Sequence, residues 1–381
     1  MEWKEYSLGD ISKLKYGKNV SAKLCKGPVP IFSGYRKIGT CNTINCKKNT
    51  VIVIARGAGG CGDVKLTKED CFLTNLSISV ELDKGICNAK WFYYNHLLNN
   101  LSFLNSGSAQ PQITIDSLSK YLIRIPPIII QRKIAGILSA LDSKIENNNK
   151  INANLEAQAQ ALFKSWFVDF TPFKDQPFVD SELGPIPQGW KVGKLGDLGE
   201  IVGGSTPSKS KPEYYTTHGI AWLTPKDLST SKAKFTSRGE IDITDEGYKS
   251  TSTKLMPRGS VLFSSRAPIG YLTIAKNEIC TNQGFKSLVP NGVGTGFVYY
   301  TLRHLTPQIE NRATGSTFKE ASATLMRSVE TIVPPTSILN KFEELLRPIL
   351  QFQEKKEEEN QRLAALRDTL LPKLMSGEIK L

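Results

Sequence analysis

Several features of common protein classes are missing from this sequence of 381 residues. No apolar run reaches the roughly eighteen residues that a membrane span needs. The longest candidate, Ile123–Ile130, contains Arg124 and two prolines. The start, MEWKEYSLGD, lacks the apolar core of a signal peptide. We therefore expect a cytoplasmic protein that makes no membrane contact.

Histidine is scarce, and the cysteines are arranged neither for disulfides nor for zinc. The three histidines, His96, His218 and His304, lie far apart in the sequence. The seven cysteines are odd in number and form no CxxC pair, the nearest two being Cys41 and Cys46. A disulfide framework needs paired cysteines, and a zinc site needs closely spaced ligands. We predict buried or incidental thiols and no metal site.

Motifs for catalysis are also missing. The sequence has no GxxxxGK[ST] phosphate-binding loop, and no Asp/Asn-Pro-Pro-aromatic tetrapeptide of an amino-group DNA methyltransferase. Gly57–Gly62 satisfies GxGxxG, but the segment that follows, DVKLTKEDCFL, is not the amphipathic helix that a dinucleotide site requires. The matching segment Arg266–Gly270 has lost the pattern. We predict no catalytic residue, and a flexible recognition loop at this glycine-rich position.

The chain is a sequence repeated twice. WKEYSLGDISKLKYG begins at Trp3 and WKVGKLGDLGEIVGG begins at Trp190, an offset of 187 residues. Later matches have an offset near 208, so the second copy carries an insertion of 21 residues between Gly204 and Arg266. The later matches pair Arg56 with Arg266, Cys71, Thr74 and Asn75 with Cys280, Thr281 and Asn282, and Ile125-Pro126-Pro127 with Val333-Pro334-Pro335.

Each copy has a globular part followed by a helical part. Short apolar runs between turn residues predict strands, and two segments predict short helices, which together give a mixed α+β domain. The strands are expected at 50–55, 76–82, 121–125, 260–264 and 272–275, and the helices at 90–101 and 296–305. After each double proline, apolar residues recur every three or four positions, which predicts a helix of about 35–40 residues.

A single helix of this kind would expose its apolar stripe, so we expect the two long helices to pair as a coil. The seam residues are Ile134, Leu138, Leu141, Ile145, Leu155, Leu162, Phe342, Leu346, Ile349, Leu363, Leu370 and Leu374. The middle of the seam is polar, with Asn148, Asn152, Lys356 and Asn360. Polar residues at such positions specify register at a cost in stability, although a wet seam or a covering partner protein would also account for them.

The net charge of +13 lies in the globular parts. Residues 1–127 have 17 basic and 9 acidic side chains, and residues 191–335 have 18 and 12. The two helical segments are near neutral, at −1 for 128–190 and zero for 336–381. Two basic modules separated by a neutral spacer indicate two contacts with a nucleic acid, with an affinity that falls steeply as salt rises.

Polar side chains in the loops after the expected strands are the candidate DNA contacts. Arginine and lysine reach guanine or phosphate, and asparagine and glutamine pair with adenine. A structural arginine that bonds to loop carbonyls is the rival interpretation for Arg56 and Arg266. The candidates are Arg36, Lys37, Arg56, Asn75, Ser108, Gln110, Gln112, Lys226, Arg266, Asn282, Gln283, Ser316 and Lys319.

Local motifs complete the pattern. They are SELGPIPQGWKVGKLGDL at Ser181–Leu198, IAWLTPKDL at Ile220–Leu228, TGSTFKEAS at Thr314–Ser322 and the terminal KLMSGEIKL. With the two basic modules and the double prolines, they resemble the specificity (S) subunit of type I restriction–modification enzymes over essentially the full length. Copy one departs from the pattern, with Ile31-Phe32-Ser33-Gly34 in place of WLTPKD and SGSAQPQIT in place of TGSTFKEAS.

The resemblance implies two tandem target recognition domains, each reading half of a bipartite, asymmetric site on double-stranded DNA. The segments would be 1–127 and 190–335 for the domains, 128–170 and 336–381 for the conserved helices, and 171–189 for a linker. The helices would form an antiparallel coil that sets the spacing and docks two methyltransferase (M) subunits. Motor-nuclease (R) subunits would join through the complex. The chain would hold no cofactor, because its partners use S-adenosylmethionine, ATP and Mg²⁺.

Two alternatives come from other function classes. One is a stand-alone architectural protein that binds double-stranded DNA or RNA and docks no enzyme. The other is a DNA methyltransferase or nuclease with unrecognised motifs, which the missing cofactor and metal patterns disfavour.

Overall fold

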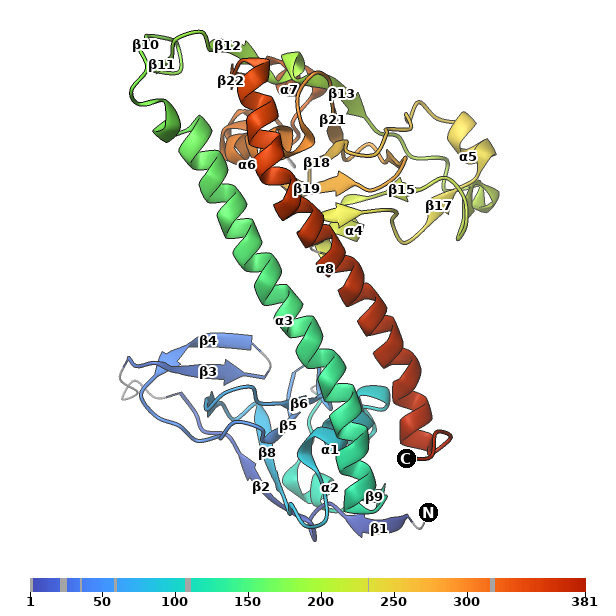
Figure 1. Cartoon of the computed structure of the whole chain (residues 1–381). Helices are drawn as coiled ribbons and strands as arrows, with labels where there is room; N and C mark the ends of the chain where they lie inside the picture. The colour runs from blue at the N-terminus through green and yellow to red at the C-terminus, as the bar shows by residue number, and fades with distance from the viewer. Residues whose placement is uncertain are drawn as a thin grey trace. The chain divides into compact units, whose positions relative to one another are not determined.

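The computed structural model describes residues 3–20, 26–34, 36–57, 60–106, 111–231, 233–315 and 319–381, which form two compact units (Figure 1). Unit 1 consists of Met1–Glu146 and Asn360–Leu381, and unit 2 of Asn147–Glu359. Two long helices, α3 (Ile128–Phe167) and α8 (Thr336–Ser376), pass from one unit into the other. Each unit combines a mixed globular part with part of each helix, so the predicted α+β class with two tandem domains is confirmed.

Unit 1 contains small sheets around a central apolar strand. Its elements are β1 (Lys4–Ser7), β2 (Ser12–Tyr16), β3 (Val29–Ser33), β4 (Arg36–Cys41), β5 (Val51–Ile54), β6 (Val64–Leu66), β7 (Phe72–Leu73), β8 (Ser77–Leu82), α1 (Ala89–Leu98), α2 (Ile115–Ser119) and β9 (Leu122–Ile125). The sheets have the orders β2-β8-β5-β6, β4-β3-β7 and β1-β9. All four residues of β5 are buried, because Val51 and Val53 pack in one core cluster and Ile52 packs in another on the opposite face of the sheet.

Unit 2 contains a five-stranded sheet of order β13-β21-β18-β19-β16 and four strand pairs, β12-β22, β15-β20, β14-β17 and β10-β11. Its strands are β10 (Phe178–Val179), β11 (Ile186–Pro187), β12 (Lys191–Lys194), β13 (Gly199–Gly203), β14 (Tyr215–Thr216), β15 (Trp222–Leu223), β16 (Phe235–Thr236), β17 (Asp242–Ile243), β18 (Val261–Ser265), β19 (Ile269–Ala275), β20 (Cys280–Thr281), β21 (Lys286–Pro290) and β22 (Glu330–Val333). Its shorter helices are α4 (Pro225–Thr230), α5 (Asp245–Lys249), α6 (Thr295–Arg312) and α7 (Ala323–Ser328).

Strand pairing repeats between the units. The first strand of each copy pairs antiparallel with the strand before the double proline, β1 with β9 and β12 with β22. The parallel pair β3–β7 corresponds to β15–β20, and the antiparallel pair β5–β8 corresponds to β18–β21. The elements β14, α4, β16, β17 and α5 occupy the region where the second copy is longer.

The long helices begin directly after the double prolines. The carbonyl of Pro127 accepts the N–H groups of Ile130 and Gln131, and the carbonyl of Pro335 accepts those of Ile338 and Leu339. Proline suits this position because the first N–H groups of a helix have no partner within it. In the described part of the chain, no helix combines the length and apolar character that a membrane crossing requires.

The helices pair in antiparallel directions, as the core contacts within each unit show. In unit 1, Leu138 near the start of α3 belongs to the same core as Leu371 and Leu374 near the end of α8. In unit 2, Phe167 at the end of α3 lies 4.7 Å (ring centroids) from Phe342 near the start of α8. The twelve predicted seam residues are all buried or half-buried.

His96 is a buried, uncharged histidine in the core of unit 1. Its Nδ1 lies 2.8 Å from the Phe92 carbonyl oxygen and therefore carries the proton, while Nε2 accepts from the Tyr121 hydroxyl at 3.3 Å. Burial lowers the pKa of His96 to about 4. The unfolded chain has a histidine pKa of about 6.5, so it takes up a proton first as the pH falls.

We expect unit 1 to lose up to about 3 kcal/mol of stability as the pH falls from about 6.5 to about 4, and to keep it above that window. Urea unfolding of the full chain at several pH values, followed by its tryptophan fluorescence, measures this slope. The variant His96→Gln keeps a donor but does not titrate, so its stability should change less over the same window. Parallel curves for both proteins would contradict the assignment.

Candidate nucleic-acid interface

In both units an arginine follows a central strand and meets a polar loop from much later in the chain. Arg56 lies two residues beyond β5 and forms a backbone bridge with Gln112. Arg266 directly follows β18 and forms a backbone bridge with Glu320. The structure thus brings together two predicted residues in unit 1, Arg56 and Gln112. In unit 2 it brings Arg266 together with Glu320, the residue that follows the predicted Lys319.

In unit 2 this arginine belongs to a network of charged and amide groups. Arg266 Nη1 lies 3.5 Å from Glu320 Oε2, and Lys286 Nζ lies 3.2 Å from Glu320 Oε1. Lys286 also donates to the Gln283 carbonyl at 3.4 Å, and the Gln283 side-chain oxygen accepts from the Thr206 hydroxyl. Sequence reasoning missed Lys286 and Glu320. The signal for Glu320 was its place beside the predicted Lys319, and no sequence motif pointed to Lys286.

Asn282 stands in a tight turn beside this network. Its side-chain oxygen accepts the Gly284 N–H at 2.9 Å, and its own N–H donates to the Leu223 carbonyl at 3.0 Å. A Cβ atom on Gly204 would lie 2.1 Å from the Asn282 carbonyl oxygen. Only glycine allows the end of β13 to approach the turn this closely.

Thr74 occupies the equivalent position in unit 1. Its N–H donates to the Phe32 carbonyl at 3.0 Å, and a Cβ atom on Gly17 would lie 2.2 Å from its carbonyl oxygen. The predicted match of Asn75 with Asn282 is therefore wrong by one residue, since Thr74 takes that place. The shared Thr-Asn dipeptide suggested the match, but the parallel pairs β3–β7 and β15–β20 set the true register.

The other candidates lie on separate elements. Arg36 and Lys37 are exposed on β4, the edge strand of its sheet, and Asn75 is half-buried between β7 and β8. Lys226 is exposed in the first turn of α4, and its Nζ lies 3.1 Å from Glu240 Oε2. Ser108, Gln110 and Ser316 lie outside the described residues.

The histidine, cysteine and acidic side chains are the groups that could form a metal-binding cluster or supply a reactive thiol. In the described ranges, no three His, Cys, Asp or Glu side chains are placed to hold a metal ion. The six cysteines that the structure describes are free thiols. Burial raises the pKa of Cys87 and of Cys280 to about 12, so both thiols stay protonated at neutral pH and are poor nucleophiles.

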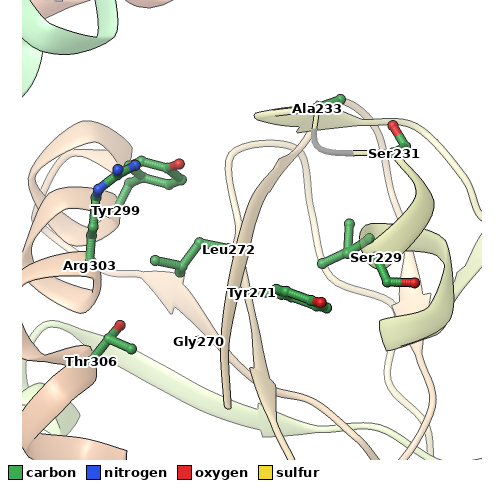
Figure 2. Close-up of a pocket in the computed structure, with 10 residues that line it drawn as sticks. Ser229, Ser231, Ala233, Gly270, Tyr271, Leu272, Tyr299, Arg303 and Thr306 are labelled. Atoms are coloured by element: carbon green, nitrogen blue, oxygen red, sulfur yellow. The ribbon is translucent and has the colours of Figure 1, made fainter. Parts of the chain in front are cut away.

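A cavity of about 500 Å³ lies beside the sheet of unit 2 (Figure 2). Tyr299, Arg303 and Thr306 of α6 line one side, and Tyr271 of β19 lies toward α4 and Ser229 on the other. None of the predicted contact residues lines it. The Arg303 guanidinium already forms an ion pair, because its Nη1 lies 2.9 Å from Glu156 Oε1.

Comparisons with known proteins relate the sequence and the fold of this chain to one family. The family model described as "Type I restriction modification DNA specificity domain" matches residues 1–157 and 187–363. The type I restriction enzyme MjaIX specificity subunit of Methanocaldococcus jannaschii is 38% identical over 179 residues, which cover 44% of this chain and 41% of that relative. The HindI specificity subunit of Haemophilus influenzae is 26% identical over 470 aligned positions, which cover 99% of this chain and 100% of the relative. The crystal structure of a type I S subunit from M. genitalium has a TM-score of 0.68 and 19% identity, covering 98% of this chain and 96% of that one, and thus has the same fold.

The close approach at β13 predicts a sharp difference between two neighbouring glycines. Gly204→Ala should destabilise the chain by about 1–3 kcal/mol, because its Cβ would collide with backbone carbonyls that cannot move aside. Gly203→Ala is the matched control, since its nearest neighbour would be the Lys286 side chain at 3.8 Å. Urea unfolding of both variants measures the difference, and equal stabilities would contradict the steric argument.

Proposed function

Because the chain belongs to the type I restriction modification DNA specificity family, we propose that it selects the DNA site for a type I restriction–modification complex. Each globular part reads one half of a bipartite, asymmetric site on double-stranded DNA, and the chain itself catalyses no reaction. The observation that carries this function is the match of the DNA specificity domain to both copies of the repeat, at 1–157 and 187–363.

The chemistry of the two globular parts suits DNA. Residues 1–127 carry a net charge of +8 and residues 191–335 a net charge of +6, which favours contact with phosphates. Arg56 and Gln112 in one unit, and Arg266 and Gln283 in the other, supply the guanidinium and amide groups that read base edges. The same arginine position with different neighbours suits two domains that read different sequences.

The helices offer a surface for the partner subunits. The predicted seam residues are buried or half-buried within the chain, so we assign the docking role to exposed residues on the same helices. Leu345 and Phe352 of α8 are 50% and 44% exposed and lie one heptad apart, hence on one face. We assign this face to one of two methyltransferase subunits, which bind S-adenosylmethionine. Motor-nuclease subunits that use ATP and Mg²⁺ join through the complex in the cytoplasm, and this chain holds no cofactor.

Co-expression with the methyltransferase subunit, followed by sequencing of the methylated genome, tests this function. One bipartite motif methylated on both strands is the expected result. An active complex that creates no new motif would contradict it and favour a stand-alone DNA-binding protein.

Arg266→Ala should relax base discrimination in one half-site only, by about 10- to 100-fold, which corresponds to about 1–3 kcal/mol for a bidentate contact. Methylation rates on sites with single-base changes measure this effect. Lys254→Ala removes the same charge from an exposed ion pair with Glu200 and should change rates uniformly or not at all. Equal losses in both half-sites would argue against modular reading.

The double substitution Leu345→Glu/Phe352→Glu should weaken capture of the methyltransferase subunit at least tenfold, because it places two charges on an apolar contact face. Pull-down with tagged methyltransferase measures capture. Leu183→Glu adds a charge at another leucine that is 40% exposed and should leave capture unchanged. Undiminished capture by the double variant would place the docking face elsewhere.

A further inference from the structure

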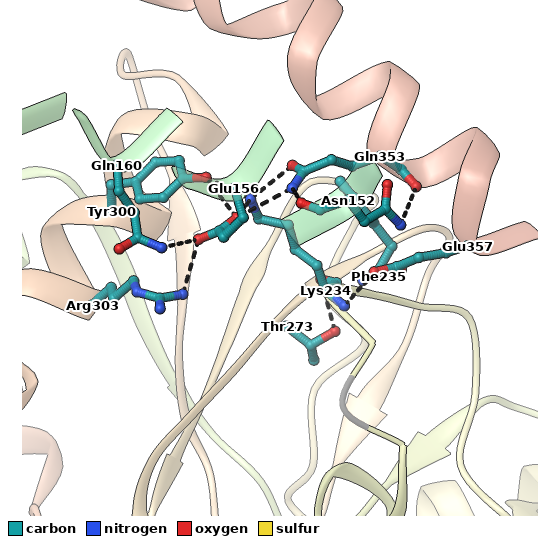
Figure 3. Close-up of polar contacts among 10 residues, drawn as sticks. All are labelled: Asn152, Glu156, Gln160, Lys234, Phe235, Thr273, Tyr300, Arg303, Gln353 and Glu357. Atoms are coloured by element: carbon teal, nitrogen blue, oxygen red, sulfur yellow. Dashed lines mark hydrogen bonds and ion pairs between the residues drawn. The ribbon is translucent and has the colours of Figure 1, made fainter. Parts of the chain in front are cut away.

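A buried lysine joins the second globular part to both long helices within unit 2 (Figure 3). Lys234, just before β16, is 7% exposed. Its Nζ lies 2.5 Å from Glu156 Oε2 on α3 and donates to Gln353 Oε1 on α8 at 2.9 Å. It also donates to the hydroxyl of Tyr300 on α6, which in turn donates to Glu156 at 3.0 Å. One ammonium group therefore contacts three helices.

The backbone around Lys234 is held by a second set of bonds. The Glu357 carboxylate on α8 accepts the N–H groups of Lys234 and Phe235 at 2.9 and 3.1 Å. The Thr273 hydroxyl of β19 donates to the Lys234 carbonyl at 3.1 Å. Side chain and backbone thus attach the same residue to α8, so a shift of the domain along this helix would break both sets.

The polar centre of the helical seam continues from this network. Gln353 is 3% exposed, and its Nε2 donates to the Asn152 carbonyl and to Glu156 Oε2, both at 3.3 Å. Burial raises the pKa of Glu156, but the charge and hydrogen bond of Lys234 outweigh it, so the net pKa lies below the usual range. The carboxylate is therefore ionised and needs its partner, since an unpaired buried charge is costly.

Apolar contacts would not impose a comparable constraint. Leucine and phenylalanine faces tolerate small slips, whereas a buried ion pair with directional bonds is satisfied in one register only. The corresponding polar contact in unit 1 is more exposed to solvent. The Asp142 carboxylate accepts from the Tyr94 hydroxyl at 2.6 Å and pairs with Arg367 at 2.8 Å. The side chains of Asp142 and Arg367 are 33% and 27% exposed. The buried ion pair therefore constrains the position of the second domain on the helices more strictly than the exposed pair constrains the first.

We propose that Lys234 is a positioning residue that sets the pose of the second recognition domain on the helix pair, and thereby the spacer length accepted between the two half-sites. The inference rests on the proposed function for its readout. Lys234 acts through the pose of the domain, because its side chain is buried. The cavity of Figure 2 borders the network through Ala233 and Arg303 and leaves room for the segment to move once the bonds are lost.

The test uses the full chain assembled with methyltransferase subunits, and a DNA library that keeps both half-sites and varies the spacer in steps of one base pair. The wild-type complex should methylate one spacer length. Lys234→Met should methylate neighbouring spacers at rates within tenfold of the original one, with both half-sites still required. Arg258→Met is the matched control, because it removes an exposed ion pair with Glu354 between the same domain and helix, and it should keep the wild-type preference.

Lys234→Met leaves Glu156 buried without its partner and could fail to fold. The double variant Lys234→Met/Glu156→Leu avoids this problem, since it replaces the pair with apolar side chains of similar volume. A folded double variant with relaxed spacer choice supports the proposal. A folded double variant with the wild-type spacer preference overturns it.

A readout without DNA separates this proposal from the proposed function. If the wild-type complex methylates no bipartite site, the function fails, and amide hydrogen exchange still tests the positioning contact. The double variant should then exchange the amide of Phe235 at least tenfold faster than wild type, with the Arg258→Met control unchanged. Unchanged exchange at Phe235 would overturn the positioning role.

Discussion

The fold depends on the burial of two long amphipathic helices that neither unit could cover alone. The first turns of α3 place Ile134 and Leu138 in the core of unit 1, while its last turns place Phe163 and Phe167 in the core of unit 2. The α8 helix does the same in the opposite direction, with Phe342 in unit 2 and Leu374 in unit 1. Because each globular core includes both helices, neither domain is complete without them.

This arrangement separates the scaffold from the candidate DNA-contact surfaces. Several strand pairs recur in both units, and so does the glycine that lies against the turn at Thr74 or Asn282. The side chains around the repeated arginine differ, with Gln112 in unit 1 and Glu320 in unit 2. The strand pairs thus recur while the polar side chains beside the arginine change.

Much of the architecture was predictable because it follows from local sequence patterns. The double prolines and the heptad spacing predicted α3 and α8, and the apolar run VIVIA predicted the central strand β5. For the candidate site, only the types of residue and the loops that carry them were predictable. The repeat indicated Arg56 and Arg266 as candidates, which remain predictions. The register of Asn282 was misjudged by one residue, because the shared Thr-Asn dipeptide outweighed the pairing of β15 with β20.

The repeat, the placement of positive charge in two modules, the long helices with a polar centre and the family could all be predicted from the sequence. These features follow from spacing along one segment or from comparison of two segments. The contacts between groups that lie far apart in the sequence depend on tertiary packing. Lys234 and Glu156 are 78 residues apart, and Arg266 and Glu320 are 54 apart. Such contacts depend on how strands and helices pack, and a buried ion pair forms only where packing excludes water around both partners.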